Sequence, residues 1–331
     1  MGYKEFLKNI ASSSFLKSKR VRSFAKWILF GILITLIVTY TNFQEIFGIF
    51  SSIPLMNFLI YIIILSAARF LYAYRWKIIN NLISQQTDPK LTVFFSTNLL
   101  AEFFSIAIPS SLGGEALRYL KINPFNKDGV LTTLAILIDR VFGIGAMILV
   151  SIIALLLMEK KIQLDIENMI PSNLLFPLLF SGFAIILVIL FILYKYLKRT
   201  TLMEKLHSAM NQIIRQWKSF IVVLLVSIIS HIIFALAHIV LFQAIHPLPI
   251  ISIISVILTP QLARSIPISL FGVSGGEGLM VFGQLLVGLS QSEAIAITAL
   301  TLLSRYFFAF FGLLIELLED GTKIFKKTKK E

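Results

Sequence analysis

Apolar segments long enough to cross a membrane follow one another along almost the whole chain. A helix needs about 20 mainly apolar residues to cross a hydrocarbon core of about 30 Å. Hydrophobic residues make up 57% of this chain and charged residues 14%, whereas a soluble domain has about 25% charged residues. We therefore expect an all-α polytopic membrane protein. Its helices are predicted near 27–41, 53–74, 91–107, 129–158, 172–196, 219–244, 250–268 and 293–318, with a shorter apolar piece at 278–289.

The basic residues gather in three parts of the chain: residues 1–26, residues 195–218 and the tail after 319. Lysine and arginine favour the cytoplasmic side of a membrane, so we predict that both termini lie in the cytoplasm. Residues 1–26 mix these charges with apolar side chains, which is typical of an interfacial segment. The net charge of +13 therefore indicates a membrane surface rather than nucleic acid as partner. A bacterial cytoplasmic (inner) membrane is the expected location. The connections 42–52, 159–171 and 244–250 are expected outside.

The segment "IAIPSSLGGEALRYLKI" at 106–122 does not fit a simple membrane span. Helix 53–74 must end inside, because Arg75 and Lys77 follow it, and helix 129–158 must begin inside. Everything between these two helices must therefore begin and end inside, which a single span cannot do. The sequence predicts a re-entrant helical hairpin at 91–122, broken at "PSSLGG".

A second copy of this pattern occurs later in the chain. Residues 250–290 must begin and end outside by the same reasoning, and Ile-Pro-x-Ser-Leu followed by Gly-Gly-Glu occurs at both 108–115 and 266–277. The next helix in each case carries a basic residue followed by an aromatic one, in "LIDRVFG" and "LLSRYFF". We predict an inverted repeat, residues 53–158 and 219–318, within a single membrane domain 1–331. This architecture has about six full transmembrane helices and two re-entrant hairpins.

In such a repeat the two broken segments meet near the bilayer midplane and line a cavity. The N-terminus of a half-helix presents free N–H groups, and arginine offers a two-pronged donor, so both suit a phosphate group. The predicted substrate-binding residues are Ser110, Ser111, Gly113, Gly114, Glu115, Arg118, Asp139, Arg140, Arg264, Ser269, Ser274, Gly275, Gly276, Glu277 and Arg305. Glu102 is a candidate for coupling transport to protons or for pairing with an arginine. Structural ion pairs, and turns that serve only helix packing, are the alternative interpretation.

An intramembrane serine protease is a further alternative. The sequence "GVSG" at 272–275 resembles the nucleophile motif of rhomboid proteases, with Ser274 in the place of the nucleophile. A serine nucleophile needs a nearby base, and no histidine follows His246. We therefore expect no enzymatic activity.

Other charged and polar residues of the helices have simpler interpretations. His231 and His238 lie seven residues apart on one helix face, a spacing that favours packing over metal binding. No metal or cofactor is expected. Arg69, Arg75 and Lys77 lie near a helix end, so we expect their side chains to reach the lipid head groups.

The "P-x-S-L…GGE-x-x-R" and "IPIS…G…GGEG" elements, with the eight hydrophobic segments, resemble the lysylphosphatidylglycerol synthase transmembrane family of flippase-like proteins. The similarity extends over nearly the whole chain. In two-domain members of that family, the membrane part moves an aminoacylated lipid between leaflets and a separate domain synthesises it. Nothing after residue 319 is expected to form such a domain. The resemblance therefore implies a stand-alone lipid transporter, acting as a homo-oligomer or with a partner enzyme that makes the lipid.

Two classes of transporter remain open at this point. A lipid flippase and a secondary transporter of a small organic anion both fit an arginine-lined cavity. The 29 phenylalanines favour a lipid substrate. The chain has no nucleotide-binding loop of the G-x-x-x-x-G-K-[ST] kind, so we expect any energy to come from a gradient, a partner or downhill exchange.

Overall fold

The computed structural model describes residues 43–84, 88–107, 112–157, 215–264, 269–270 and 273–328, which contain nine α-helices and two very short strands. Contacts divide the chain into two compact units, residues 1–50 and residues 51–331. The first unit contributes most of helix α4 (Phe43–Ser52), on which Phe43 and Phe47 are exposed. The predicted helices 27–41 and 172–196, and the interfacial segment 1–26, lie outside the described residues. All further description concerns the second unit.

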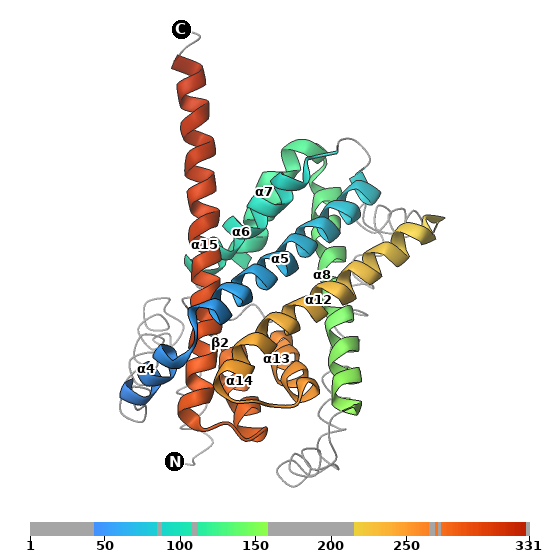
Figure 1. Cartoon of the computed structure of the whole chain (residues 1–331). Helices are drawn as coiled ribbons and strands as arrows, with labels where there is room; N and C mark the ends of the chain where they lie inside the picture. Colours follow the sequence, from blue (N-terminus) through green and yellow to red (C-terminus); the bar gives the residue numbers. More distant parts are fainter. Residues whose placement is uncertain are drawn as a thin grey trace, which may run out of the picture. The chain divides into compact units, whose positions relative to one another are not determined.

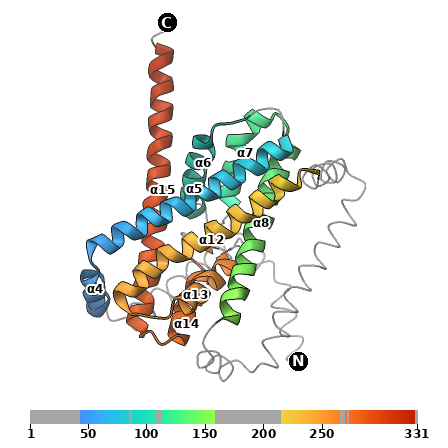
Figure 2. The ribbon, with the colours of Figure 1, turned by 45° about the vertical axis from the view of Figure 1, so that its right-hand side comes forward.

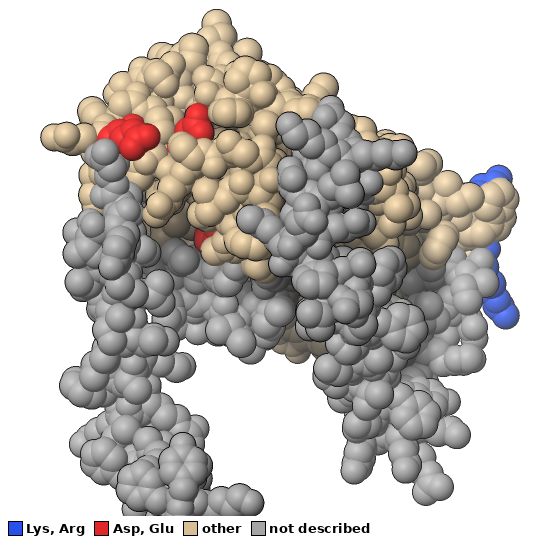
Figure 3. All heavy atoms as spheres, turned by 90° about the horizontal axis from the view of Figure 1, so that it is seen from below, with Lys and Arg blue, Asp and Glu red and all other residues tan. Residues whose placement is uncertain are grey.

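Among the described residues of this unit, four helices are long and apolar enough to cross a membrane. They are α5 (Leu55–Ser84), α8 (Gly129–Leu156), α12 (Trp217–Ile245) and α15 (Gln291–Thr328). The sequence predicts each of them, although α5 continues beyond residue 74. It does so because buried side chains continue along it, among them Trp76, Ile79 and Ile83. On the face shown in Figure 3, most of the described atoms belong to uncharged residues.

Helices α6 (Leu91–Ala107) and α7 (Leu112–Asn126) pack side by side as a helical hairpin, visible in Figures 1 and 2. Gly114 makes this packing close. A Cβ atom at Gly114 would lie 2.3 Å from the Ser105 hydroxyl oxygen and 2.7 Å from the Ala101 carbonyl oxygen. The predicted break between the two helices, residues 108–111, falls outside the described residues.

The connection between this hairpin and α8 ends in an N-terminal cap of α8. The Asp128 carboxylate accepts hydrogen bonds from the backbone N–H groups of Val130 (2.9 Å) and Leu131 (3.2 Å), which satisfies donors that the first turn of a helix leaves free. Asn126 exchanges side-chain hydrogen bonds with Asn80 of α5. These contacts hold α5, α7 and α8 together at one end.

A second helical hairpin consists of α13 (Ile250–Arg264) and α14 (Gly275–Leu286), which also pack on each other. Between them, β1 (Ser269–Leu270) and β2 (Val273–Ser274) pair antiparallel, with Ser269 opposite Ser274. The second copy of the motif has more residues between its proline and its glutamate than the first copy. The short ribbon accommodates them.

The two hairpins pack in a reciprocal way. The first helix of each hairpin packs against the long helix that follows the other: α6 lies on α15, and α13 lies on α8. Helices α5 and α12 run side by side between them (Figures 1 and 2). Gly312 allows α15 to approach α6 closely, since a Cβ atom there would lie 2.3 Å from the backbone carbonyl carbon of Leu99.

Candidate functional site

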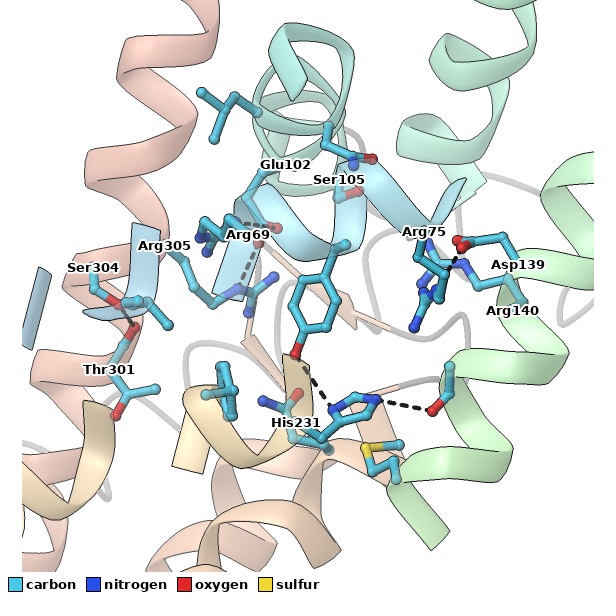
Figure 4. A pocket seen from close by; sticks show the side chains of 18 of the residues that line it. Arg69, Arg75, Glu102, Ser105, Asp139, Arg140, His231, Thr301, Ser304 and Arg305 are labelled. Atoms are coloured by element: carbon cyan, nitrogen blue, oxygen red, sulfur yellow. Dashed lines mark hydrogen bonds and ion pairs between the residues drawn. The ribbon is translucent and has the colours of Figure 1, made fainter. Parts of the chain in front are cut away.

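A cavity of about 290 Å³ lies among these helices. It receives side chains from both halves of the chain and is lined by Tyr61, Leu65, Arg69, Tyr72, Arg75, Asn98, Leu99, Glu102, Ser105, Arg118, Asp139, Arg140, Gly143, Ile144, Met147, His231, Phe234, His238, Gln261, Thr301, Ser304 and Arg305. Figure 4 shows two groups of charged side chains around it, with Arg69, Glu102 and Arg305 on one side and Arg75, Asp139 and Arg140 on the other.

The first group, which we call the Glu102 cluster, joins four helices. The Glu102 carboxylate of α6 accepts a hydrogen bond from Arg305 Nε of α15 at 2.7 Å and lies 3.5 Å from Arg69 Nη1 of α5. Arg305 Nη1 also donates to Glu277 of α14 at 3.3 Å. The Arg69 guanidinium lies over the ring of Phe308, 4.3 Å from its centroid. The cluster consists of Arg69, Glu102, Glu277 and Arg305.

The second group, which we call the Asp139 cluster, lies on α5, α7 and α8. Asp139 accepts a hydrogen bond from Arg75 Nε at 2.7 Å, and its other oxygen lies 3.6 Å from Arg118 Nη1. Glu115 lies 3.8 Å from Arg118 and also pairs with Arg140. The Arg118 guanidinium lies over the Trp76 ring at 5.0 Å. The cluster consists of Arg75, Glu115, Arg118, Asp139 and Arg140.

Gly143 of α8 makes room for one of these arginines. A Cβ atom at this position would lie 3.0 Å and 3.1 Å from the two terminal nitrogens of Arg75. Distances of this kind are tighter than ordinary van der Waals contact, so any larger residue would displace the guanidinium. The absence of a side chain at Gly143 therefore lets Arg75 reach Asp139 from within the helix packing.

The Gly143 carbonyl also fixes one proton of the His231 ring. Its oxygen lies 2.9 Å from His231 Nε2 and can only accept a hydrogen bond, so Nε2 carries the proton. His231 Nδ1 lies within hydrogen-bond distance of the Tyr72 hydroxyl, at 3.3 Å. The two contacts hold the His231 ring between α5 and α8.

His238 lies edge-on to Tyr61, whose hydroxyl is hydrogen-bonded to Ser304 at 3.0 Å. In the described ranges, no three His, Asp, Glu or Cys side chains are grouped as a metal site would require. The interpretation of His231 and His238 as packing residues agrees with these contacts, and both also line the cavity.

Many of the residues singled out from the sequence meet at this site. Glu102, Arg118, Asp139, Arg140 and Arg305 line the cavity, while Glu115 and Glu277 pair with its arginines. Gly113, Gly114 and Gly276 are buried near the start of α7 or α14 without lining it. Ser110 and Ser111 lie outside the described residues, and nothing is described of the side chains of Arg264, Ser269, Ser274 or Gly275.

Sequence reasoning missed other residues of the cavity. Arg75 was expected to reach the head groups, and this is wrong: its side chain is only 7% exposed and is paired with Asp139. Arg69 likewise turns inward to Glu102 and Phe308. The apolar residues that continue along α5 past residue 74, among them Trp76 and Ile79, are the sequence signal that the helix remains packed beyond Arg75, although they do not identify its partner. Lys77 differs from both, because it pairs with the exposed Asp88.

Comparison with known proteins supplies an independent result. A family model described as the lysylphosphatidylglycerol synthase TM region matches residues 23–312. The chain belongs to this family. The match includes both hairpins and every described residue of the cavity. Searches of curated proteins and of solved structures found no match. The family and the apolar spans together identify an integral membrane protein with a function related to membrane lipids.

The arginines of the cavity can bind an anionic group. Charged side chains inside a membrane protein are costly unless they are paired, and they mark sites for polar or ionic ligands. Here arginines from several helices turn toward one cavity while apolar residues cover the outer faces of the spans. Guanidinium groups bind phosphate and carboxylate oxygens through paired hydrogen bonds.

Proposed function

We propose that this chain is a flippase that moves an anionic or phosphate-containing lipid, including glyco- or aminoacyl-lipids, between the two leaflets of the membrane. The observation that carries the proposal is the arginine-lined cavity, which lies among helices apolar enough to span a bilayer. A head group crossing the hydrocarbon core needs such a polar route, because the core itself offers no partner for its charge.

The inverted repeat with two re-entrant hairpins is the architecture that we propose for this transport. It is supported by the reciprocal packing of α6 on α15 and of α13 on α8. An inverted repeat gives a transporter two similar halves that can open the central site alternately to either side. The arrangement also accounts for side chains of both halves meeting at the Glu102 cluster.

The size of the cavity favours a lipid whose tails remain outside it. Sites for drug-sized ligands have volumes of about 300–1,000 Å³, so a cavity of about 290 Å³ suits a head group and not a whole lipid. Acyl chains would lie along the apolar outer faces of the helices. A secondary transporter of a small organic anion is the alternative, since a cavity of about 290 Å³ also suits such a molecule.

The proposal also includes the absence of enzymatic activity, the location, the topology and the partners that the sequence predicts. We propose that the protein is not an enzyme, that it resides in the inner membrane of a bacterium with both termini in the cytoplasm, and that it works as a homo-oligomer or beside an enzyme that makes its lipid.

Single cysteines introduced by mutation test the topology, because the chain has no cysteine of its own. Asn123→Cys should be labelled from the cytoplasm and Ser290→Cys from outside, and labelling of both from one side would contradict the inverted repeat.

Reconstitution tests the transport itself. The purified protein is placed in phosphatidylcholine vesicles with a trace of phosphatidylglycerol labelled on an acyl chain, and dithionite bleaches the label in the outer leaflet. The wild-type protein should make the inner-leaflet label accessible. Arg118→Gln should slow this by roughly tenfold, whereas Lys77→Gln, a basic residue of α5 outside the cavity, should not.

Two outcomes would count against the proposal. Wild-type vesicles that bleach no faster than protein-free ones would reject a flippase. Uptake of radiolabelled glycerophosphoglycerol in such vesicles would favour the transporter of small anions instead. Size-exclusion chromatography of each variant shows whether a loss of transport reflects unfolding.

A further inference from the structure

The two charged clusters of the cavity differ in their balance of charge. Among the described pairs, the Glu102 cluster sets Arg69 and Arg305 against Glu102 and Glu277, and Glu277 and Arg305 make further interactions besides these. The Asp139 cluster contains three arginines and two carboxylates, so its formal charge is 3 − 2 = +1. His231 and His238 also line the cavity and are left out of this count. The count covers the described side chains, and Arg264 is outside it.

Free hydrogen-bond donors are found on the side with excess charge. Arg75 Nη1 and both Nε and Nη1 of Arg118 are buried without a hydrogen-bond acceptor in the part of the chain that the structure describes. The Arg75 side chain is more than nine-tenths buried, with an exposed fraction of 7%, and Arg75 and Arg118 both line the cavity. Buried donors of this kind normally have a partner.

The Glu102 cluster is more fully satisfied. Arg305 uses Nε for Glu102 and Nη1 for Glu277. Arg69 has an unpaired Nε, but its Nη1 pairs with Glu102 and its face is covered by Phe308. Binding an anion here would mean taking an arginine from a carboxylate that would then be buried alone, which is unfavourable.

We propose that the Asp139 cluster is the binding subsite for a phosphodiester carrying one negative charge, with Arg75 and Arg118 as its main donors. One such charge neutralises the excess of +1. A phosphomonoester would leave a buried negative charge, and a zwitterionic head group would leave the positive charge in place. The subsite rests on the proposed function, since it assigns the class of head group that the flippase carries.

The Glu102 cluster has a different role in this assignment. It ties α5 and α6 to α14 and α15 through ion pairs, and it takes no part in holding the phosphate. Head-group selectivity should therefore depend on Asp139 and Glu115, which set the charge of the subsite, and not on total charge elsewhere in the protein.

The test measures binding separately from transport. Thermal unfolding of the full-length protein in detergent is followed with dihexanoyl phosphatidylglycerol, phosphatidic acid and phosphatidylcholine, and in parallel with water-soluble glycerophosphoglycerol. The wild-type protein should be stabilised most by phosphatidylglycerol. Stabilisation by glycerophosphoglycerol at equal concentration would identify a free phosphodiester, and not a lipid, as the source of the group.

Variants that change the charge of the subsite give the decisive result. Asp139→Asn and Glu115→Gln each raise the charge to +2 and should shift the affinity ratio of phosphatidic acid to phosphatidylglycerol upward by about tenfold. Arg75→Gln lowers the charge to zero and should shift preference toward phosphatidylcholine. Asp88→Asn and Lys77→Gln, which make the same charge changes outside the cavity, should leave the ratios as in the wild type.

Every outcome bears on the subsite. Affinity ratios that stay unchanged in Glu115→Gln and Arg75→Gln would overturn it, even if vesicle transport is observed. Glu115→Gln makes the same charge change as Asp139→Asn and replaces it in the test if Asp139→Asn does not fold. Charge-dependent binding without any vesicle transport would uphold the subsite and reject the flippase, so the two failures are distinguishable.

Discussion

Helices α8 and α15 each follow a helical hairpin whose second helix carries Gly-Gly-Glu, yet they build opposite sides of the cavity. In the two matching stretches, Asp139 and Arg140 stand where α15 has Ser304 and Arg305, and Gly143 stands where it has Phe308. Asp139 holds Arg75 inside, whereas Ser304 makes a neutral hydrogen bond to Tyr61. A few differences between the matching stretches therefore place a carboxylate that pairs with Arg75 on one side of the cavity and a neutral hydrogen bond on the other.

The acidic residue of α8 should matter far more than its counterpart on α15. Asp139→Ala leaves Arg75 buried without its carboxylate, which costs about 3–5 kcal/mol, whereas Ser304→Ala removes one neutral hydrogen bond worth about 1 kcal/mol. Thermal unfolding in detergent measures both. Equal losses in the two variants would remove the distinction between the helices. Adding Arg75→Met to Asp139→Ala should recover part of the loss.

Gly312 lies in a tightly packed interface between α15 and α6, whereas Gly145 of α8 does not contact a neighbouring helix closely. Gly312→Ala places a Cβ atom 2.3 Å from the Leu99 backbone, which the backbone cannot avoid without moving, and should cost about 1–3 kcal/mol. Gly145→Ala on α8 is the matched control, because a Cβ atom there meets nothing within 4 Å. The comparison fails if the two variants unfold at the same temperature.

Gly143 should affect transport more than stability. Gly143→Ala crowds the terminal nitrogens of Arg75, which are at the far end of a flexible side chain and can shift. We expect unfolding within about 1 kcal/mol of the wild type but a severalfold slower flipping rate in the vesicle assay. A normal rate would show that the position of the Arg75 guanidinium is not critical.

The smallest effect on the melting temperature is expected for the ion pair of Lys77 and Asp88, which lies outside the cavity. Hydrogen bonds from Lys77 at 2.9 Å and from Asn81 at 2.6 Å hold the pKa of Asp88 below its usual value of 3.8. A lowered pKa stabilises the folded state above the unfolded pKa, and this contribution is lost as pH falls through the folded pKa. Melting temperatures of the wild type and Asp88→Asn should therefore differ slightly near pH 6 and converge below pH 3.8. A constant difference would contradict this linkage.

Much of the second unit could be predicted from the order of apolar segments and basic residues. Helix α6 has the bounds predicted for it, and Glu102, Arg118 and Arg305, which the sequence singles out, line one cavity. The partners of these residues could not be predicted in the same way. Which arginine meets which carboxylate depends on the rotation of each helix about its axis, and helices that are apolar on all faces leave that rotation undetermined.

Arg75 shows a second limit of prediction from the sequence. A charged residue at the end of an apolar run was interpreted as the end of the span, because water or head groups usually receive such a charge. Here Asp139 on another helix receives it, and the opening that admits the guanidinium is the missing side chain of Gly143. A contact that depends on an absent side chain in a distant segment has no signature in the local sequence.

The contact at Gly312 also constrains how the molecule can move. With α15 lying against the peptide backbone of α6, a slide of one helix along the other would bring the neighbouring side chains of α15 onto Leu99 and Leu100. Helices α6 and α15 should consequently travel as one rigid body during any change of access. The displacement that opens the cavity is then left to other interfaces, such as that of α8 with α13.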